Sequence, residues 1–262
     1  MLKKISTITI ATALLVSATP TFAAEKTSAT RTSKNTKTHH SYKKTNSEAA
    51  PLDPSPAPAP LPVAPTQPSA PNIISTSIPW GTTIFDGYGS VTWNSALQQL
   101  NMAPQAATQP SETHASLVVS SQTLKQPFQL SYTMKTIQQL RTGSTPNPWE
   151  TGWILFGYKP DGKFKYIVLK PQGYGVEMGE SLLNNAQDFL YTSTFNQDIF
   201  PVNDTYNVVL NVKNNVVTMT VNGKQYVSYA MSGNDQLTAD GQYGFYTEDA
   251  NVQVSNIVAQ QL

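Results

Sequence analysis

The sequence predicts an all-β protein: an antiparallel two-sheet sandwich of the jelly-roll form, preceded by a disordered tail and a Pro-rich linker. Three observations support this prediction. Apolar and polar residues alternate over many short stretches, Asn and Gly residues separate several of them, and only residues 96–102 have a helix-like pattern. About ten or more strands with partly apolar faces require a second sheet, because a single sheet would leave one apolar face in water.

The first 23 residues are expected to be a signal peptide that is cleaved after Ala23. Lys3 and Lys4 precede an apolar run over residues 8–18, which is shorter than the roughly 20 residues that cross a bilayer. No Cys stands at the cleavage point, so a bacterial lipoprotein anchor is excluded. We therefore expect an exported protein without a transmembrane segment after signal cleavage, located in the periplasm, at the cell surface or in the extracellular medium.

Two segments of biased composition follow the signal peptide. Residues 24–49 form a basic tail rich in Ser, Thr and Lys, and residues 50–71 are rich in Pro and Ala. The tail lacks the apolar area that would offset chain entropy, whereas the Pro-rich segment favours extended geometry, so we predict a disordered tail and a semi-rigid linker. Together they hold six basic and three acidic side chains. The tail is therefore either a solvated arm or a contact for an anionic envelope polymer, lipid headgroups or nucleic acid.

Residues 72–262 have the length and composition of a single β-sandwich domain. They carry nine basic and thirteen acidic side chains. This net negative charge disfavours binding of nucleic acid by the folded domain. The whole chain contains no Cys, which excludes disulfides, zinc-thiolate sites and thiol nucleophiles, so the domain depends on its hydrophobic core alone.

Strand patterns begin at residues 116–120 and are clearest at residues 128–135, where every second residue from Phe128 to Met134 is apolar. Asn214–Asn215 and Asn222–Gly223 predict hairpin turns within a meander over residues 206–230, because Asn and Gly tolerate the positive φ angles of two-residue turns. A short turn is also expected near residues 181–187. Further strands are expected at residues 152–158, 164–170, 175–178, 189–192, 242–247 and 252–258.

Aromatic and charged residues interrupt the apolar pattern between Trp149 and Glu177, and this stretch is the first candidate for a site. Aromatic faces beside charged groups suit sugar rings, because a pyranose has an apolar face and a polar rim. Glycan recognition is therefore the leading hypothesis. The residues expected to bind the ligand are Arg141, Trp149, Glu150, Tyr166, Lys170, Glu177, Tyr246 and Glu248.

The environment of some of these side chains also follows from the sequence. Trp149 stands on a Pro-flanked loop and is expected to be an exposed ring, whereas Trp153 is expected to pack in the protein. Lys170 shares one side of its strand with Tyr166 and Val168, so its amine is expected to meet a carboxylate.

Glu177 and Glu248 form the candidate catalytic pair, because glycoside hydrolysis needs an acid and a base or nucleophile about 5–9 Å apart. Each of them can equally be a surface acid at a strand end or an ion-pair partner of Lys170 or Arg141. A Ser nucleophile is not expected, because the chain has no Gly-x-Ser-x-Gly turn and His114 is the only His of the folded domain.

No cofactor is expected, with a structural calcium ion as the alternative. Asp86, Asp240 and Asp249 are the candidate calcium ligands, because all three stand in predicted turns, where carboxylate and carbonyl oxygens can surround the ion. No recognisable calcium-loop motif accompanies them.

The end of the chain has a patterned pair of strands. Gly241, Gly244 and Tyr246 follow a Gly-x-x-Gly-hydrophobic-Tyr pattern, and residues 252–257 follow Val-x-Val-x-Asn-Ile. This ending resembles the closing strands of concanavalin A-like sandwiches, the superfamily of lectin, laminin-G-like, carbohydrate-binding and glucanase domains. It is also similar to the domain found in bacterial 3-keto-disaccharide hydrolases. The resemblance extends over residues 72–262 and is most specific at residues 149–158, 166–177 and 241–257.

The resemblance implies a jelly-roll fold and, in many members, a glycan ligand. This chain departs from two groups of the superfamily. It has no Glu-x-Asp-x-x-Glu run of the laminarinase type, which argues against an endoglucanase. His114 also lacks the Asp and Asn neighbours that hold metal ions in legume-type lectins, which argues against a site of that kind.

Three functions remain open on the sequence, and the first is preferred. The first is an exported, non-catalytic sandwich that binds a glycan or cell-envelope polysaccharide. The second is a glycoside hydrolase of the 3-keto-disaccharide hydrolase kind, in which Glu177 and Glu248 act on a substrate held by Arg141 and Lys170. The third is a structural envelope protein that contacts another protein through an exposed apolar patch.

Overall fold

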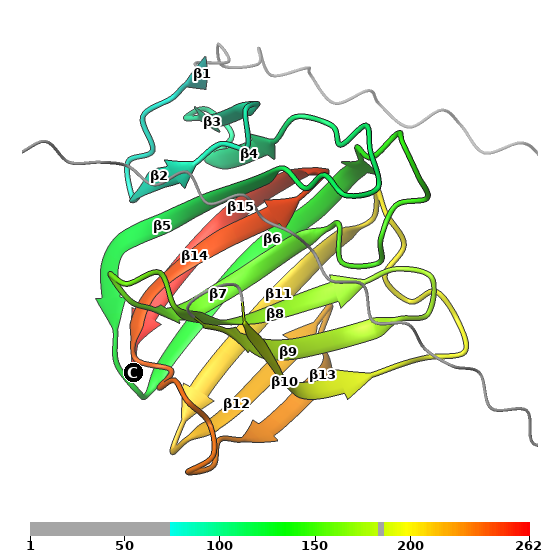
Figure 1. Ribbon diagram of the computed structural model, residues 1–262. Coiled ribbons are helices and arrows are strands. Elements are labelled where there is room, and N and C mark those ends of the chain that lie inside the picture. Colours follow the sequence, from blue (N-terminus) through cyan, green and yellow to red (C-terminus); the bar gives the residue numbers. More distant parts are fainter. Residues whose placement is uncertain (1–73, 183–185) are drawn as a thin grey trace, which may run out of the picture. The chain divides into compact units, whose positions relative to one another are not determined.

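Two antiparallel sheets stack face to face and form a sandwich (Figure 1). The computed structural model describes residues 74–182 and 186–262. The predictions of a signal peptide, a basic tail and a Pro-rich linker concern residues outside these ranges. Within the described ranges no helix is long and apolar enough to cross a bilayer. The two stacked antiparallel sheets confirm the predicted all-β sandwich.

We call the sheet of eight strands sheet A. Its edge strands are β1 and β13, and its centre is formed by β15 and β6. In spatial order it contains β1 (Ile74–Ser75), β3 (Ser90–Asn94), β4 (Gln99–Ala103), β15 (Ala250–Gln261), β6 (Phe128–Gln139), β11 (Thr205–Lys213), β12 (Val216–Val221) and β13 (Lys224–Ala230).

We call the sheet of seven strands sheet B. Its edge strands are β10 and β2, and β7 lies at its centre. In spatial order it contains β10 (Gln187–Ser193), β9 (Gly175–Ser181), β8 (Phe164–Lys170), β7 (Gly152–Tyr158), β14 (Gly241–Glu248), β5 (Ala115–Leu124) and β2 (Gly81–Phe85).

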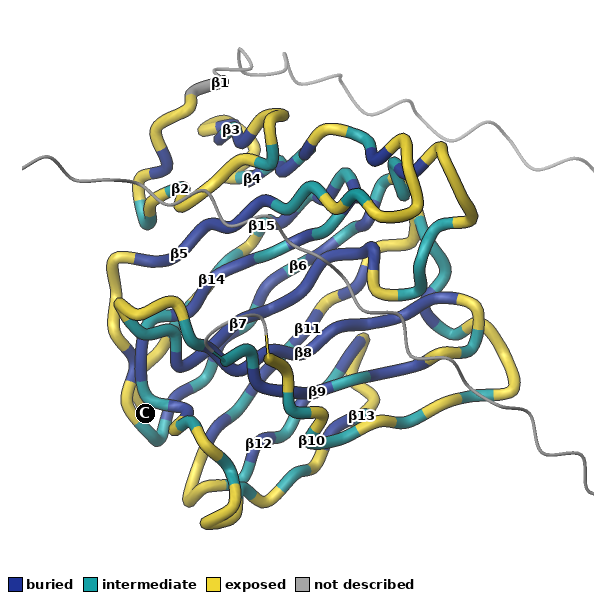
Figure 2. The backbone as a smooth tube through the Cα atoms, viewed as in Figure 1, coloured by how far each residue is buried: buried dark blue, intermediate teal, exposed yellow. Residues whose placement is uncertain are grey.

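The main core lies between the inner faces of the two sheets, where the central strands are buried (Figure 2). β6 buries Phe128, Leu130, Tyr132 and Met134 and leaves the alternate residues partly exposed, as its period-two pattern predicts. β8 is different, because all seven of its residues are buried. Its nearly continuous apolar sequence is what a strand covered on both faces requires.

The Asn-containing turns have the backbone geometry that the sequence predicts. Asn214, Asn215, Asn222 and Gly223 have φ angles of 51°, 60°, 49° and 81°. Positive φ at both central positions matches the right-handed twist of the paired strands, so β11, β12 and β13 follow one another as neighbours in sheet A.

The helix-like pattern of residues 96–102 is a wrong prediction, because this segment is a turn followed by β4. The Asn94 side chain accepts hydrogen bonds from the backbone N–H groups of Ala96 and Leu97, both at 3.1 Å. Gln98 has a φ of 48°, which ends any helical path and starts a hairpin. β4 then pairs with β15, so tertiary pairing overrides local helix propensity.

Candidate functional site

The outer faces of the two sheets differ in chemistry. The outer face of sheet A carries a ladder of polar side chains: Thr133 donates to Asn207 at 2.9 Å, and Gln129 donates to Asn211 at 2.7 Å. The outer face of sheet B is aromatic and apolar instead. An ordinary outer face would be polar, so the second apolar layer on sheet B needs its own explanation.

This second layer, which we call the sheet B face, is arranged in rows across neighbouring strands. The strand register places one row as follows: Leu117 of β5, Tyr246 of β14, Trp153 of β7, Val168 of β8 and Glu177 of β9. The adjacent row contains Val119, Gly244, Leu155, Tyr166, Gly179 and Phe189. The face therefore combines a continuous apolar layer with a carboxylate at one side.

Aromatic rings in this layer contact one another closely. The ring centroids of Trp153 and Tyr166 are 4.7 Å apart, and those of Trp153 and Tyr246 are 5.1 Å apart. Tyr246 also contacts Phe85 and Phe164, each at 6.3 Å between centroids. Such packing holds the phenol groups of the two tyrosines in fixed directions.

Glu177 is held by two partners from β8. Lys170 Nζ lies 2.7 Å from Glu177 Oε2, and the Tyr166 hydroxyl donates to Glu177 Oε1 at 3.2 Å. The predicted meeting of the Lys170 amine with a carboxylate is thus confirmed. Burial and the nearby Glu177 carboxylate raise the pKa of the Tyr166 phenol far above its usual value, so this hydroxyl stays protonated and acts as a donor.

Gly179 makes room for this arrangement. A Cβ atom at Gly179 would lie 2.6 Å from the Tyr166 hydroxyl and 2.7 Å from the carbonyl oxygen of Asp188. Any larger residue would displace the phenol from the Glu177 carboxylate. The glycine is therefore required by the close approach of a side chain and of a neighbouring backbone carbonyl, and not by its own backbone conformation.

Glu248 is a carboxylate of a different kind. It follows Tyr246 by two positions on β14 and accepts a hydrogen bond from the Tyr246 hydroxyl. Burial raises the pKa of Glu248 to about 7, and the Asp249 and Glu150 carboxylates also raise it, whereas the Tyr246 hydroxyl and the Trp149 side chain lower it. In the described part of the chain Glu248 has no ion-pair partner.

Exposed rings surround the buried layer. Trp149, in the loop before β7, is 41 % exposed, whereas Trp153 is 3 % exposed and donates its indole N–H to the Trp149 carbonyl at 2.7 Å. The prediction that Trp149 is exposed and Trp153 packs is confirmed. Phe85 on β2 and Phe189 on β10 are 42 % and 64 % exposed and lie on the opposite edge strands of sheet B.

Phe85 and Phe189 were not among the residues expected to bind a ligand. The sequence around Phe85 has no pattern long enough to predict β2, so nothing there connects it to Tyr246. Phe189 stands in a predicted strand, and its apolar ring beside polar neighbours was a usable signal of an edge position.

Arg141 and Glu150 are not placed to bind a ligand. Arg141 Nε lies 2.5 Å from Glu150 Oε1, and Arg141 Nη2 lies 2.8 Å from Asp249 Oδ2, with all three side chains buried. Arg141 also donates to the carbonyl oxygens of Gln109 and Glu112 at 3.0 and 2.9 Å. The guanidinium group thus ties three chain segments together beneath the surface, which corrects the expectation that Arg141 and Glu150 face a ligand.

The candidate pair of Glu177 and Glu248 shares the sheet B face but is not close. β9 and β14 are separated by β8 and β7, which puts the two backbones about 14 Å apart at about 4.8 Å per strand. Glu177 is moreover neutralised by Lys170. Neither residue is bonded to Arg141, which was one of the expected ion-pair partners.

The three candidate calcium ligands do not come together. Asp86 accepts a hydrogen bond from the backbone of Tyr88, Asp240 accepts one from the backbone of Gln126, and Asp249 is paired with Arg141. Among the residues that the structure describes, no group of three His, Asp or Glu side chains is arranged to hold a metal ion.

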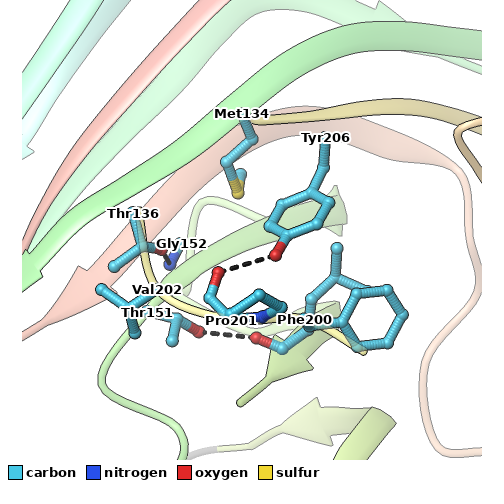
Figure 3. A pocket seen from close by; sticks show the side chains of 9 residues that line it. Met134, Thr136, Thr151, Gly152, Phe200, Pro201, Val202 and Tyr206 are labelled. Atoms are coloured by element: carbon cyan, nitrogen blue, oxygen red, sulfur yellow. Dashed lines mark hydrogen bonds between the residues drawn. The ribbon is translucent and has the colours of Figure 1, made fainter. Parts of the chain in front are cut away.

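A small cavity between the sheets is too small to be a ligand site (Figure 3). Its volume of about 10 Å³ is close to the least that holds one water molecule. Met134, Thr136, Thr151, Gly152 and Tyr206 are among its lining residues. A larger hollow of about 300 Å³ is lined by Lys163, Leu182, Ala186, Gln236 and Leu237, none of them aromatic. The sheet B face, with its aromatic rings, is therefore the better candidate site.

The structure contains a buried charge cluster that was not predicted from the sequence. Lys165, on the inner side of β8, pairs with Glu180 of β9 and lies 2.9 Å from Asp235 Oδ2 in the loop between β13 and β14. Glu180 also accepts hydrogen bonds from the backbone N–H groups of Gln236 and Leu237. This cluster fastens the loop to the end of the sandwich and has no contact with the sheet B face.

Comparisons with known proteins support the fold. No protein-family model and no curated protein matches the chain. Among solved structures, the carbohydrate binding module CBM66 from Bacillus subtilis is similar at a TM-score of 0.52 and 13 % identity, over 69 % of this chain and 95 % of that one. Sheep galectin-11, solved with glycerol, has a TM-score of 0.40 and 12 % identity, over 54 % of this chain and 96 % of that one. The similarity to the carbohydrate binding module supports the predicted sandwich fold.

Proposed function

We propose that the sandwich is a non-catalytic glycan-binding domain of an exported protein and that the sheet B face is its binding surface. The observation that carries this proposal is the combination on one sheet face of exposed aromatic rings with fixed hydrogen-bonding groups. Trp149, Phe85 and Phe189 offer apolar surfaces on which a sugar ring can stack. Glu177, Lys170 and Glu248 supply acceptors and donors for hydroxyl groups.

The polar groups of this face are already ordered before a ligand arrives. Glu177 is fixed by Lys170 and Tyr166, and Glu248 is fixed by Tyr246. Groups held in place lose little conformational entropy on binding, which favours recognition of a ligand with many weak contacts. The fold shared with a carbohydrate binding module makes glycans the first class of ligand to test.

The remaining parts of this proposal come from the sequence. The signal peptide would deliver the chain to the periplasm, the cell surface or the medium. The Pro-rich linker would hold the sandwich away from the basic tail, and the tail would contact an anionic envelope polymer. The sandwich itself would take a cell-envelope polysaccharide or another glycan.

A glycan array tests the proposal with the full chain, in calcium and in EDTA. We expect binding to at least one glycan class and a loss of about tenfold or more in affinity for Trp149→Ala. Leu97→Ala is the matched control, because Leu97 is 56 % exposed but lies in the turn between β3 and β4 of sheet A. Equal losses in both variants, or no binding to any glycan, would refute the proposal, and the latter would favour protein contact.

Glycoside hydrolysis is a second candidate, and one observation favours it. A carboxyl group with a pKa of about 7 can act as a general acid at neutral pH, and Glu248 has this pKa. Incubating each bound glycan with the full chain and analysing the products separates the two functions. A hydrolase gives products that disappear in Glu248→Gln, whereas a binding domain leaves every glycan intact.

A further inference from the structure

The charge around Glu248 is unbalanced. Arg141 is already shared between Glu150 and Asp249, and His114 Nδ1 also lies 3.8 Å from Asp249 Oδ1. Both of these carboxylates act electrostatically on Glu248 and raise its pKa, and Glu150 Oε2 is buried without a hydrogen-bond partner among the described residues. Three carboxylates therefore share one guanidinium group and the imidazole of His114.

No other cation on the sheet B face offsets this charge. The two rows of this face contain no basic residue, and Lys170, which lies beyond Val168 on the same side of β8, is neutralised by Glu177. The sandwich as a whole is also acidic, with nine basic and thirteen acidic side chains over residues 72–262. An anionic sugar would meet repulsion here, whereas a cationic group would be attracted.

Aromatic rings stand beside this carboxylate. The exposed Trp149 side chain interacts with Glu248, and Tyr246 donates its hydroxyl to it. Phe85 contacts the Tyr246 ring edge to face, with 6.3 Å between centroids. An ammonium group that pairs with this carboxylate gains a charge-assisted hydrogen bond, and the sugar ring that carries it can stack on the exposed Trp149 ring.

We propose that the site around Glu248 selects glycans with free, protonated amino groups, such as oligomers of glucosamine, over their N-acetylated or uronic acid counterparts. The ammonium group would pair with the Glu248 carboxylate while the sugar ring stacks on Trp149. This inference rests on the proposed glycan binding at the sheet B face and specifies the class of sugar.

Isothermal titration of the full chain with three oligomers of equal length tests this inference. The oligomers are of glucosamine, N-acetylglucosamine and galacturonic acid, at about pH 6.5, where an amine with a pKa of about 7.7 carries its proton. We expect glucosamine oligomers to bind about tenfold or more tightly than acetylated ones, since bonds to charged groups are the stronger ones. Glu248→Gln should remove this preference and leave the affinity for acetylated oligomers within about threefold.

A proton count provides a second measurement. A bound ammonium group favours the charged form of Glu248, so binding should release protons, and the measured heat should vary with the ionisation enthalpy of the buffer. Glu248→Gln should lose this dependence. Asp161→Asn is the matched control, because Asp161 is an exposed acid in the turn between β7 and β8 and pairs with Lys163.

The possible outcomes separate this inference from the proposed function. Equal affinity for amino and acetylated oligomers would overturn the amino preference but leave glycan binding intact. Tightest binding of galacturonic acid oligomers would overturn it as well. Failure of all three oligomers and of the wider array would overturn both proposals together.

Discussion

Replacement of Glu248 by Gln should make the protein relatively more stable at alkaline pH than at acidic pH. The pKa of Glu248 is raised from 4.5 to about 7 in the folded state, mainly by burial. The folded protein therefore holds this proton more tightly than the unfolded chain does. Protonated Glu248 therefore stabilises the folded state. This contribution to the free energy of unfolding is fully present below pH 4.5, falls as the pH rises to about 7, and is constant above that value.

The size of this effect follows from the two pKa values. The difference between 4.5 and about 7 corresponds to about 3 kcal/mol, because each tenfold change in proton affinity is worth about 1.4 kcal/mol. Glu248 keeps partial contact with water, which reduces the expected effect to about 1–3 kcal/mol. Gln has the same size and also accepts a hydrogen bond from Tyr246, but it does not titrate.

Urea denaturation of the full-length wild type and Glu248→Gln at pH 4, 5, 6, 7 and 8 measures this contribution. The free energy of unfolding of the variant minus that of the wild type should rise by about 1–3 kcal/mol between pH 4 and pH 8. Any fixed cost of the substitution cancels in this comparison. A difference that stays constant over the whole range would show that Glu248 does not titrate abnormally and would refute the reasoning.

Three further predictions concern stability and binding. Trp153→Ala should lower the free energy of unfolding by about 3–5 kcal/mol, because Trp153 is buried. Trp149→Ala should lower it by less than about 1 kcal/mol and should lower glycan affinity. Similar unfolding midpoints of the two variants in urea would contradict this prediction. Gly179→Ala should cost about 1–3 kcal/mol and weaken glycan binding, because the new methyl group displaces a phenol, and unchanged affinity in titration calorimetry would contradict it. Lys165→Met should lower the free energy of unfolding by about 3–5 kcal/mol, because it leaves the buried Glu180 carboxylate without its cation. Adding Glu180→Leu should recover part of this loss. Additive losses in thermal unfolding of the double variant would contradict this prediction.

Two neighbouring strands of sheet B could be predicted from the sequence to the residue. β7 and β8 have the expected bounds, because long runs of apolar and aromatic residues end at Gly and Pro. β2 and β3 could not be predicted in the same way, because each has only five residues with mixed polarity. These short strands depend on pairing with distant parts of the chain, and no local pattern reports such pairing.

The candidate site was predictable only where a single strand determines it. The ion pair of Lys170 with Glu177 follows from the alternation of side chains along β8 and from the hairpin that brings β9 beside it. The partners of Arg141 could not be predicted, because Asp249 lies 108 positions away in the sequence. Because Arg141 is buried against these partners, it has a structural role and does not contact a ligand.

The two layers of the sheet B face have different roles. The buried Trp153 and Tyr166 and the partly buried Tyr246 contribute apolar contacts to the sheet, and the two tyrosines also aim their hydroxyl groups at Glu177 and Glu248. A substitution in this layer should therefore alter stability and ligand affinity together. Exposed rings have few partners in the protein, so their substitution should alter affinity almost alone. A variant set that separates these two patterns would locate the ligand on this face without a structure of the complex.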